Sequence, residues 1–242
     1  AKQLQQASFC LKYLLKALTY LDKAPISKSL ASKKTAVYLD LNAIYANWNE
    51  YELQEKYSRL ALNLAIQEKK PYEIFNAYMA MGYMYEQQLD SSPSNQELLK
   101  NTESYYIKAI ETYQSNVAEM TIPSNLSFVA INLSYLYLKY FPQSYREKAV
   151  YYAELAKKQA LETQNGTHLA SANGILADIA IQNNDSETAK KYLITALVEL
   201  ERDNIDNPQT KLSIYESLSQ IFQNENKYKE AIFYQKEYLK TF

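Results

Sequence analysis

Residues 224–232 read Asn-Glu-Asn-Lys-Tyr-Lys-Glu-Ala-Ile, and this stretch decides the fold of the chain. A short polar turn leads into a helix whose inner face carries Ala231, Tyr234 and Tyr238 at spacings of three and four residues. One stripe of an upstream helix, with the spacing i, i+3, i+4 and i+7, is formed by Tyr215, Leu218, Ser219 and Phe222. The sequence therefore predicts two helices joined by the turn, which together form a helical hairpin.

The same arrangement recurs upstream, and internal repeats of this kind are typical of solenoid proteins. The first helices carry the stripes Tyr38, Leu41, Asn42 and Tyr45; Tyr78, Met81, Gly82 and Tyr85; Ala130, Leu133, Ser134 and Tyr137; and Asn173, Leu176, Ala177 and Ala180. The inner faces of the corresponding second helices carry Tyr57, Ala61 and Leu62; Tyr105, Tyr106, Ala109 and Ile110; Ala149, Tyr152, Ala153 and Ala156; and Ala189, Tyr192, Leu193 and Ala196. The opening helix has the pattern of a second helix whose first helix is missing or frayed, with Cys10, Tyr13, Leu14, Ala17 and Leu18.

These stripes resemble the tetratricopeptide repeat, which places a large residue, Leu, a small residue and an aromatic along its first helix, and Ala, an aromatic and Ala along its second. The sequence departs from that pattern at Gln235 and Ala180, where an aromatic is usual, and at Ser186, where a turn tyrosine is usual. Spacings of 44, 48, 47 and 40 residues separate Ala17, Ala61, Ala109, Ala156 and Ala196, against about 34 in the standard repeat. Such long hairpins resemble the sensor regions of bacterial signalling proteins.

The resemblance implies an all-α fold, a right-handed superhelix or α-solenoid of about five antiparallel hairpins plus an N-terminal helix. We expect a single domain over residues 1–242, with the N-terminal helix at 2–22 and hairpins at 27–69, 71–116, 124–163, 167–203 and 208–242. Small residues such as Gly82 allow the two helices of a hairpin to cross closely. The aromatics, including most of the 24 tyrosines, are expected to fill the space between one hairpin and the next.

Composition narrows the classes of protein. Only 3 Gly and 6 Pro are present, which disfavours strands joined by tight turns. With 26 Lys and Arg against 27 Asp and Glu, the formal net charge is −1 and no basic footprint of a nucleic-acid binder is present. Mean hydropathy is −0.44, and no apolar run approaches the roughly 18 residues that cross a membrane. We therefore expect neither direct nucleic-acid binding nor membrane insertion by this segment.

The sequence offers no constellation for catalysis, for a metal or for a cofactor. Cys10 is the one cysteine and is expected to be a buried small residue of its helix. His168 is the one histidine, and a solvent-exposed or helix-capping role is expected for it; two such residues cannot form a zinc site. No calcium loop, phosphate loop or serine nucleophile elbow appears. We predict a protein without catalytic residues, metal or cofactor.

The family resemblance implies that the first helices line a concave groove. Amides and tyrosines on that face can pair with a peptide backbone and supply apolar contact, so a protein or peptide is the expected partner. The predicted groove residues are Asn76, Met79, Tyr83, Asn132, Tyr135, Lys139, Asp178, Gln182, Gln220 and Asn224. The alternative is that they are merely solvated, or are covered by a neighbouring helix. One inward position holds Ala43, Tyr83, Tyr135, Asp178 and Gln220, without the cationic clamp with which related adaptors bind a terminal carboxylate.

The leading functional hypothesis is a non-catalytic scaffold, the sensor or interaction region of a bacterial signal-transduction or transcription-regulatory protein. The alternative is a free-standing adaptor or assembly factor without an output domain; a hydrolase or phosphatase has no supporting residues. The final helix leaves apolar residues uncovered near Phe242, so we expect either that the native chain continues or that this hairpin forms a homodimer contact. Whether the segment is cytoplasmic or periplasmic stays open.

Overall fold

The computed structural model describes residues 2–24, 28–141, 145–202 and 207–241. These residues form α-helices with one short 3₁₀-helix, and the described ranges contain no strand. In chain order the elements are α1 (Lys2–Lys23), α2 (Lys28–Asn47), α3 (Tyr51–Gln67), α4 (Pro71–Ser91), α5 (Gln96–Ser115), η1 (Val117–Glu119), α6 (Asn125–Tyr140), α7 (Arg146–Glu162), α8 (Gly166–Gln182), α9 (Ser186–Arg202), α10 (Pro208–Asn224) and α11 (Tyr228–Thr241).

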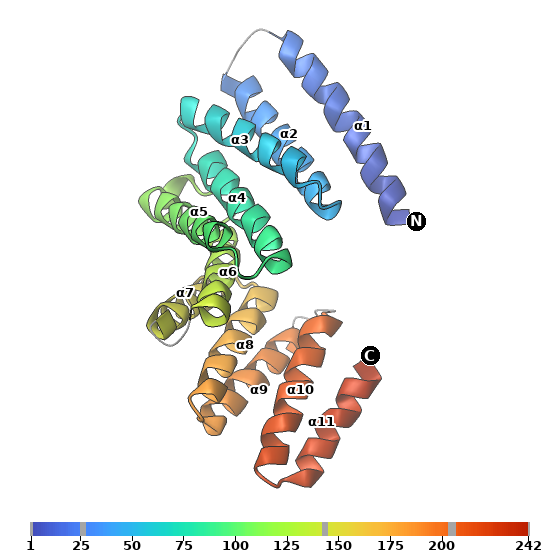
Figure 1. The fold of residues 1–242 in the computed structure, drawn as a ribbon, viewed down its shortest axis with the longest axis vertical. Helices are drawn as coiled ribbons and strands as arrows, with labels where there is room; N and C mark the ends of the chain where they lie inside the picture. Colours follow the sequence, from blue (N-terminus) through green and yellow to red (C-terminus); the bar gives the residue numbers. More distant parts are fainter. Residues whose placement is uncertain (1, 25–27, 142–144, 203–206, 242) are drawn as a thin grey trace. The chain divides into compact units, whose positions relative to one another are not determined.

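After α1, consecutive helices pair as antiparallel hairpins, α2 with α3 through α10 with α11 (Figure 1). We call the first helix of each hairpin an A helix (α2, α4, α6, α8, α10) and the second a B helix (α3, α5, α7, α9, α11). The predicted all-α, solenoid-like fold of helical hairpins preceded by one helix is confirmed. The predicted hairpin limits at residues 27, 203 and 242 lie outside the described residues.

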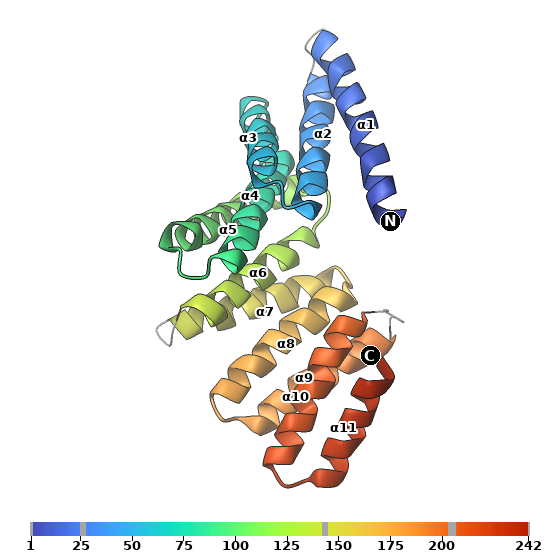
Figure 2. The ribbon, with the colours of Figure 1, turned by 45° about the vertical axis from the view of Figure 1, so that its right-hand side comes forward.

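The chain divides into two compact units, residues 1–121 and 122–242. Unit 1 holds α1 to α5 and unit 2 holds α6 to α11, and Figure 2 shows the helices of each from a second direction. Within unit 2, α8 packs beside both α6 and α10, so that the A helices are neighbours. In unit 1, α2 packs beside α4 in the same way. In neither unit does a described helix have the length and apolarity needed to cross a membrane.

The turns use asparagine where glycine would be the ordinary choice. Asn49, Asn184 and Asn226 have φ values of 56°, 59° and 58° and occupy matching places in the turns of three hairpins. Asparagine tolerates this left-handed region better than other residues with a Cβ, and it commonly ends a helix there. A chain with only 3 glycines can therefore close its turns.

One position of the A helix carries a small or short side chain in every hairpin. This position determines how closely the two helices of a hairpin approach each other. Asn42, Ser134 and Ser219 donate side-chain hydrogen bonds to backbone oxygens of their B helices at 3.1, 2.6 and 3.1 Å. The acceptors are Gln54, Ala149 and Ala231, each the fourth residue of its helix. Small or short side chains let the helices approach closely, and the added bond sets the register between them.

Gly82 holds the same position in the second hairpin. Here the residue must be small because of an aromatic ring, and not because of a hydrogen bond. A Cβ built on Gly82 would lie 2.4 Å from Cδ1 of Tyr106, whose ring is fully buried against α4. The Tyr106 hydroxyl donates to Oε2 of Glu86 at 2.5 Å, which anchors the ring in that place. The prediction that close packing explains Gly82 is confirmed, and the packing partner is one aromatic ring.

Stacked aromatic pairs join the two helices of single hairpins. Tyr45–Tyr57, Tyr85–Tyr105, Tyr137–Tyr152 and Phe222–Tyr234 have centroid distances of 5.6, 5.5, 5.8 and 5.6 Å. Their interplanar angles are 2°, 9°, 13° and 4°. These rings therefore pack within hairpins, and some also reach the neighbouring helices: the Tyr85 hydroxyl donates to Glu55 Oε1 of α3 at 3.3 Å. Three of these pairs couple the end of an A helix to the second turn of its B helix, whereas Tyr105 lies in the third turn of α5.

Replacing Gly82 by Ala should destabilise the protein by about 1–3 kcal/mol, because the new methyl group overpacks a buried ring that cannot withdraw. The matched control is Gly174→Ala, since a Cβ at Gly174 meets nothing within 4 Å. That change should stabilise helix α8 by about 0.5–1 kcal/mol. Thermal unfolding followed by circular dichroism measures both effects. Equal melting temperatures for the two variants would contradict the packing role of Gly82.

Candidate binding site

The predicted groove residues of unit 2 share the accessible side of its three A helices. We call this surface the unit 2 A face. Tyr135 and Lys139 on α6, Asp178 and Gln182 on α8, and Gln220 and Asn224 on α10 are exposed, and Asn132 on α6 is half-buried. The opposite sides of the same helices carry core residues such as Leu133, Leu176 and Leu218. Seven of the ten predicted residues therefore do lie on neighbouring helices, on one accessible surface.

The other three predicted residues belong to unit 1. Asn76 and Met79 are half-buried and Tyr83 is exposed, all on α4. The neighbouring A helix, α2, exposes Asp40 and Ala43 one turn apart. We call this surface the unit 1 A face. Because the chain forms two compact units, the ten residues are described as two sets.

Each A face carries one carboxyl group that the surrounding protein desolvates. Asp178 retains accessible surface, yet burial raises the pKa of its carboxyl group. Burial likewise raises the pKa of the Asp40 carboxyl on α2. Neither carboxylate forms a hydrogen bond or an ion pair with any described residue. A carboxylate that is desolvated and has no partner destabilises the folded state. Such groups are concentrated at functional sites.

Sequence reasoning found Asp178 and missed Asp40. Asp178 stands at the inward position of the repeat itself, whereas Asp40 lies one turn before the corresponding Ala43. The spacing of three residues on a helix places both on the same stripe. A search for acidic residues within one turn of each inward position would have included Asp40.

Several other residues of the unit 2 A face already contact one another. The Lys139 ammonium lies 5.6 Å from the ring centroid of Tyr135 and 4.9 Å from that of Tyr140. Gln220 Nε2 donates to Asn224 Oδ1 at 3.3 Å on the exposed side of α10. The lysine is therefore held over aromatic rings, whereas the carboxylate of Asp178 on α8 has no hydrogen-bond or ion-pair partner among the described residues.

One of the predicted groove residues, Gln220, lines a cleft. A cleft of about 410 Å³ between α10 and α11 is lined by Gln220, with Ser219, Gln235 and Tyr238 among its neighbours. A second cleft, of about 600 Å³, lies in unit 1 between the ends of α3, α4 and α5 and includes Ile66, Tyr78 and Lys108. The A faces themselves are open surfaces, which suit an extended ligand better than an enclosed small molecule.

His168 differs from the expected exposed or capping residue. Its ring is half-buried, and Nδ1 lies 2.6 Å from Ser127 Oγ, which links α8 to α6. Ser127 Oγ also donates to the Ser124 carbonyl oxygen at 2.6 Å, an arrangement that suits the tautomer of His168 with its proton on Nδ1. The cap of α8 is Asn165, whose Oδ1 accepts from the His168 backbone N–H at 3.0 Å. His168 is thus a link between neighbouring A helices.

Cys10 is exposed, where a buried residue was expected. It lies on the face of α1 that a preceding A helix would cover in the repeat pattern, next to the exposed rings of Phe9 and Tyr13. Leu11, Leu14 and Leu18 on the other side of α1 do pack against the first hairpin. The exposure of Cys10 therefore follows from its place on the side of α1 that faces away from the first hairpin.

The described residues contain no group of three or more His, Cys, Asp or Glu side chains that could hold a metal ion. The sequence matches no protein-family model and no curated protein. The fold is similar to the crystal structure of BtubC (BKLC) from P. vanneervenii, with a TM-score of 0.76 and 14% sequence identity. That similarity covers 100% of this chain and 91% of the other. At this level of identity it shows the fold alone.

Replacing Asp178 by Asn should raise the melting temperature at neutral pH. A carboxyl group whose folded pKa lies above its unfolded value of 3.8 destabilises the folded state once pH exceeds that folded pKa. Below pH 3.8 the group is protonated in both states, so the gain from the substitution should disappear. Thermal unfolding of both proteins at several pH values tests this. A variant less stable than the parent at pH 7 would show that Asp178 has a stabilising partner.

Acidification should destabilise the contact between α6 and α8 through His168. Desolvation lowers the pKa of the imidazole below 6.5, so the unfolded chain binds the proton more readily than the folded chain. Stability contributed by this group is present above pH 6.5 and falls as pH drops toward its folded pKa. His168→Asn keeps a donor near Ser127 without a titrating ring. The difference in melting temperature between parent and variant should narrow between pH 8 and pH 5, whereas a constant difference would contradict this role.

Proposed function

We propose that this protein is a non-catalytic scaffold that binds a protein or peptide segment on its A faces. In the full biological setting it would serve as the sensor or interaction region of a bacterial signal-transduction or transcription-regulatory protein. A free-standing adaptor with the same binding mode is the alternative. The proposal rests chiefly on the unpaired, desolvated carboxylate of Asp178 in the middle helix of the unit 2 A face.

The chemistry of the face favours a ligand with cationic groups. A carboxylate that burial has desolvated but not paired gains most from a lysine or arginine side chain, or from a terminal ammonium group. Asp40 offers the same chemistry on the unit 1 A face. Lys139 also lies on the unit 2 A face, and a free lysine would favour an acidic ligand. Its ammonium group, however, already lies over the rings of Tyr135 and Tyr140. The partner segment is therefore expected to be basic.

The remaining groups of the unit 2 A face suit an extended backbone. Gln182, Gln220 and Asn224 are exposed amides, each with a donor and an acceptor. Tyr135 adds an exposed ring with a polar hydroxyl group. A segment lying across α6, α8 and α10 would meet aromatic, acidic and amide side chains in turn. This order gives specificity through the Asp178 carboxylate and affinity through many polar contacts.

Selection from a phage-displayed random peptide library against the intact protein should enrich sequences rich in Lys and Arg. Isothermal titration of an enriched peptide against Asp178→Asn should show affinity reduced about tenfold, because a charge-assisted hydrogen bond is lost. Glu147→Gln is the matched control, since Glu147 is exposed on α7, a B helix. The proposal fails if the enriched peptides bind the Asp178→Asn variant as tightly as the parent.

A further inference from the structure

Helix α9 carries a row of exposed residues on the side that faces away from the core. Ile194 and Val198 are 43% and 53% exposed, and they lie between Lys191 and Glu201, which are also exposed. Steps of three, four and three residues place all four on one stripe of the helix. The next helix of the chain, α10, packs against the buried side of α9. The exposed row is therefore not the place where the following hairpin packs.

The two ends of this row carry opposite charges, Lys191 at one end and Glu201 at the other. Neither residue forms a hydrogen bond or an ion pair with a described residue. By contrast, Glu187 and Arg202, which are exposed nearby, form ion pairs within α9 at 2.6 and 2.5 Å. An occupant of the row therefore needs an acidic group at one end, an apolar middle and a basic group at the other end.

An antiparallel second copy of α9 meets all three requirements. If two copies pack about a two-fold axis at the level of Ala196, Ile194 of one copy faces Val198 of the other, and Lys191 faces Glu201. By symmetry each of these contacts forms twice. A surface of a single charge, such as an anionic bilayer, would attract Lys191 but repel Glu201. The order of charges along the row thus favours the chain itself as the partner.

The preceding B helix, α7, has a matching row at the same level. Counted from the first residue of each helix, the four residues of the α9 row correspond on α7 to Tyr151, Glu154, Lys158 and Leu161, and all four are exposed. About the same axis, Glu154 of one copy faces Lys158 of the other, and Tyr151 faces Leu161. The row on α7 is therefore complementary to itself in the same antiparallel arrangement.

The two rows can take part in one contact because α7 and α9 are neighbours. The Lys157 ammonium on α7 lies 5.1 Å from the ring centroid of Tyr192 on α9. Glu154 and Lys158 form ion pairs within α7 at 3.8 and 3.9 Å, and surface pairs of this kind contribute little and can be exchanged. We infer that the exposed rows of α7 and α9 form a contact between two copies of this chain, related by a two-fold axis that crosses both helices.

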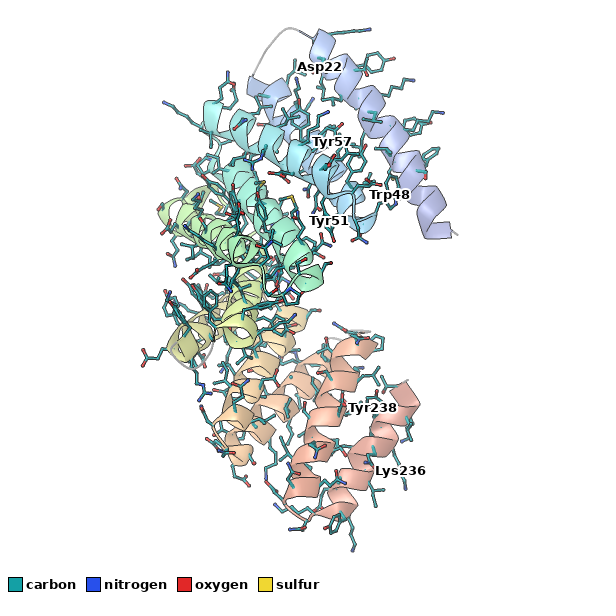
Figure 3. All side chains as sticks on the ribbon, viewed as in Figure 1. Asp22, Trp48, Tyr51, Tyr57, Lys236 and Tyr238 are labelled. Carbon is teal, nitrogen blue, oxygen red and sulfur yellow. The ribbon has the colours of Figure 1, made fainter. Side chains whose placement is uncertain are left out.

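The complementary pattern does not continue onto α11. At the places of Ile194 and Val198, α11 has the exposed residues Lys236 and Lys240 (Lys236 is labelled in Figure 3). The same arrangement about α11 would bring lysines of two copies together. We therefore place the contact on α7 and α9 and not on the last hairpin. It involves the B helices of unit 2, so it does not depend on peptide binding at the A faces.

Sedimentation equilibrium of the intact chain over a range of concentrations should show an equilibrium between monomer and dimer. Lys191→Glu should raise the dissociation constant of the dimer about tenfold, because both contacts between Lys191 and Glu201 become contacts between two carboxylates. Glu201→Lys should weaken the dimer similarly, because two ammonium groups then meet. Lys100→Glu on α5 and Lys236→Glu on α11 make the same charge change at exposed positions of other B helices. These two matched controls should leave the dissociation constant unchanged.

The decisive measurement mixes the two α9 variants. In a dimer of one Lys191→Glu chain and one Glu201→Lys chain, both charged contacts again join opposite charges, so this mixed dimer should be about tenfold tighter than either variant with itself. One variant carries fluorescein at Cys10, the one cysteine of the chain, which is exposed, so that its sedimentation can be followed alone.

Ile194→Gln tests the apolar part of the contact and should weaken the dimer about fivefold, because symmetry removes two apolar contacts at once. All the substituted residues are exposed. Circular dichroism spectra and melting temperatures that match those of the parent, measured at a concentration where every protein is a monomer, confirm that the variants fold.

Several outcomes would overturn the inference. A chain that stays monomeric at the highest concentration would leave the rows of α7 and α9 to a different protein. A mixture of the two α9 variants that shows no preference for the mixed dimer would exclude the two-fold pairing. A dimer weakened by Lys236→Glu and not by Lys191→Glu would move the contact to the last hairpin. Flotation with vesicles of phosphatidylcholine and phosphatidylglycerol that Lys191→Glu abolishes would assign α9 to a lipid surface.

Discussion

The close crossing of the two helices in each hairpin is the constraint on which the rest of the structure depends. Short side chains at one position of the A helix let the B helix approach, and a hydrogen bond from Asn42, Ser134 or Ser219 to a backbone oxygen fixes the register. Once the register is fixed, the aromatic at the end of the A helix lies over the tyrosine in the second turn of the B helix. The stacked pairs are thus a consequence of the crossing, and they stiffen the hairpin near its turn.

The same constraint determines which side chains are free to bind. Leucine and the small residue of each A helix face inward, so the positions between them on the helical wheel must face outward. This is why Tyr135, Asp178 and Gln220 recur at one accessible position of successive helices. A surface built in this way consists of rows of side chains with little depth. The rows can acquire or lose a charge, as at Asp178, without disturbing the core beneath.

Much of the fold could be predicted because each sequence feature recurs in several hairpins. The helix pairs, the small position and the accessible rows all follow from spacing. Single features were harder to predict. The exposure of Cys10 depends on what covers α1, and the contact of His168 with Ser127 joins residues 41 positions apart in the sequence. Asn173 is fully buried, yet its amide has no hydrogen-bond partner among the described residues, and we have no physical account of it. The desolvation of Asp40 likewise depends on its surroundings.

The asparagines of the turns have a consequence for the unfolded chain. Glycine in a left-handed turn is free of strain, but it gives the unfolded chain more conformations to lose on folding. With Asn49, Asn184 and Asn226 in these places, and Lys69 and Gln164 in the left-handed region between hairpins, the unfolded backbone is less free at five of its bends. Part of the entropic cost of folding is thereby replaced by local strain in the native turns.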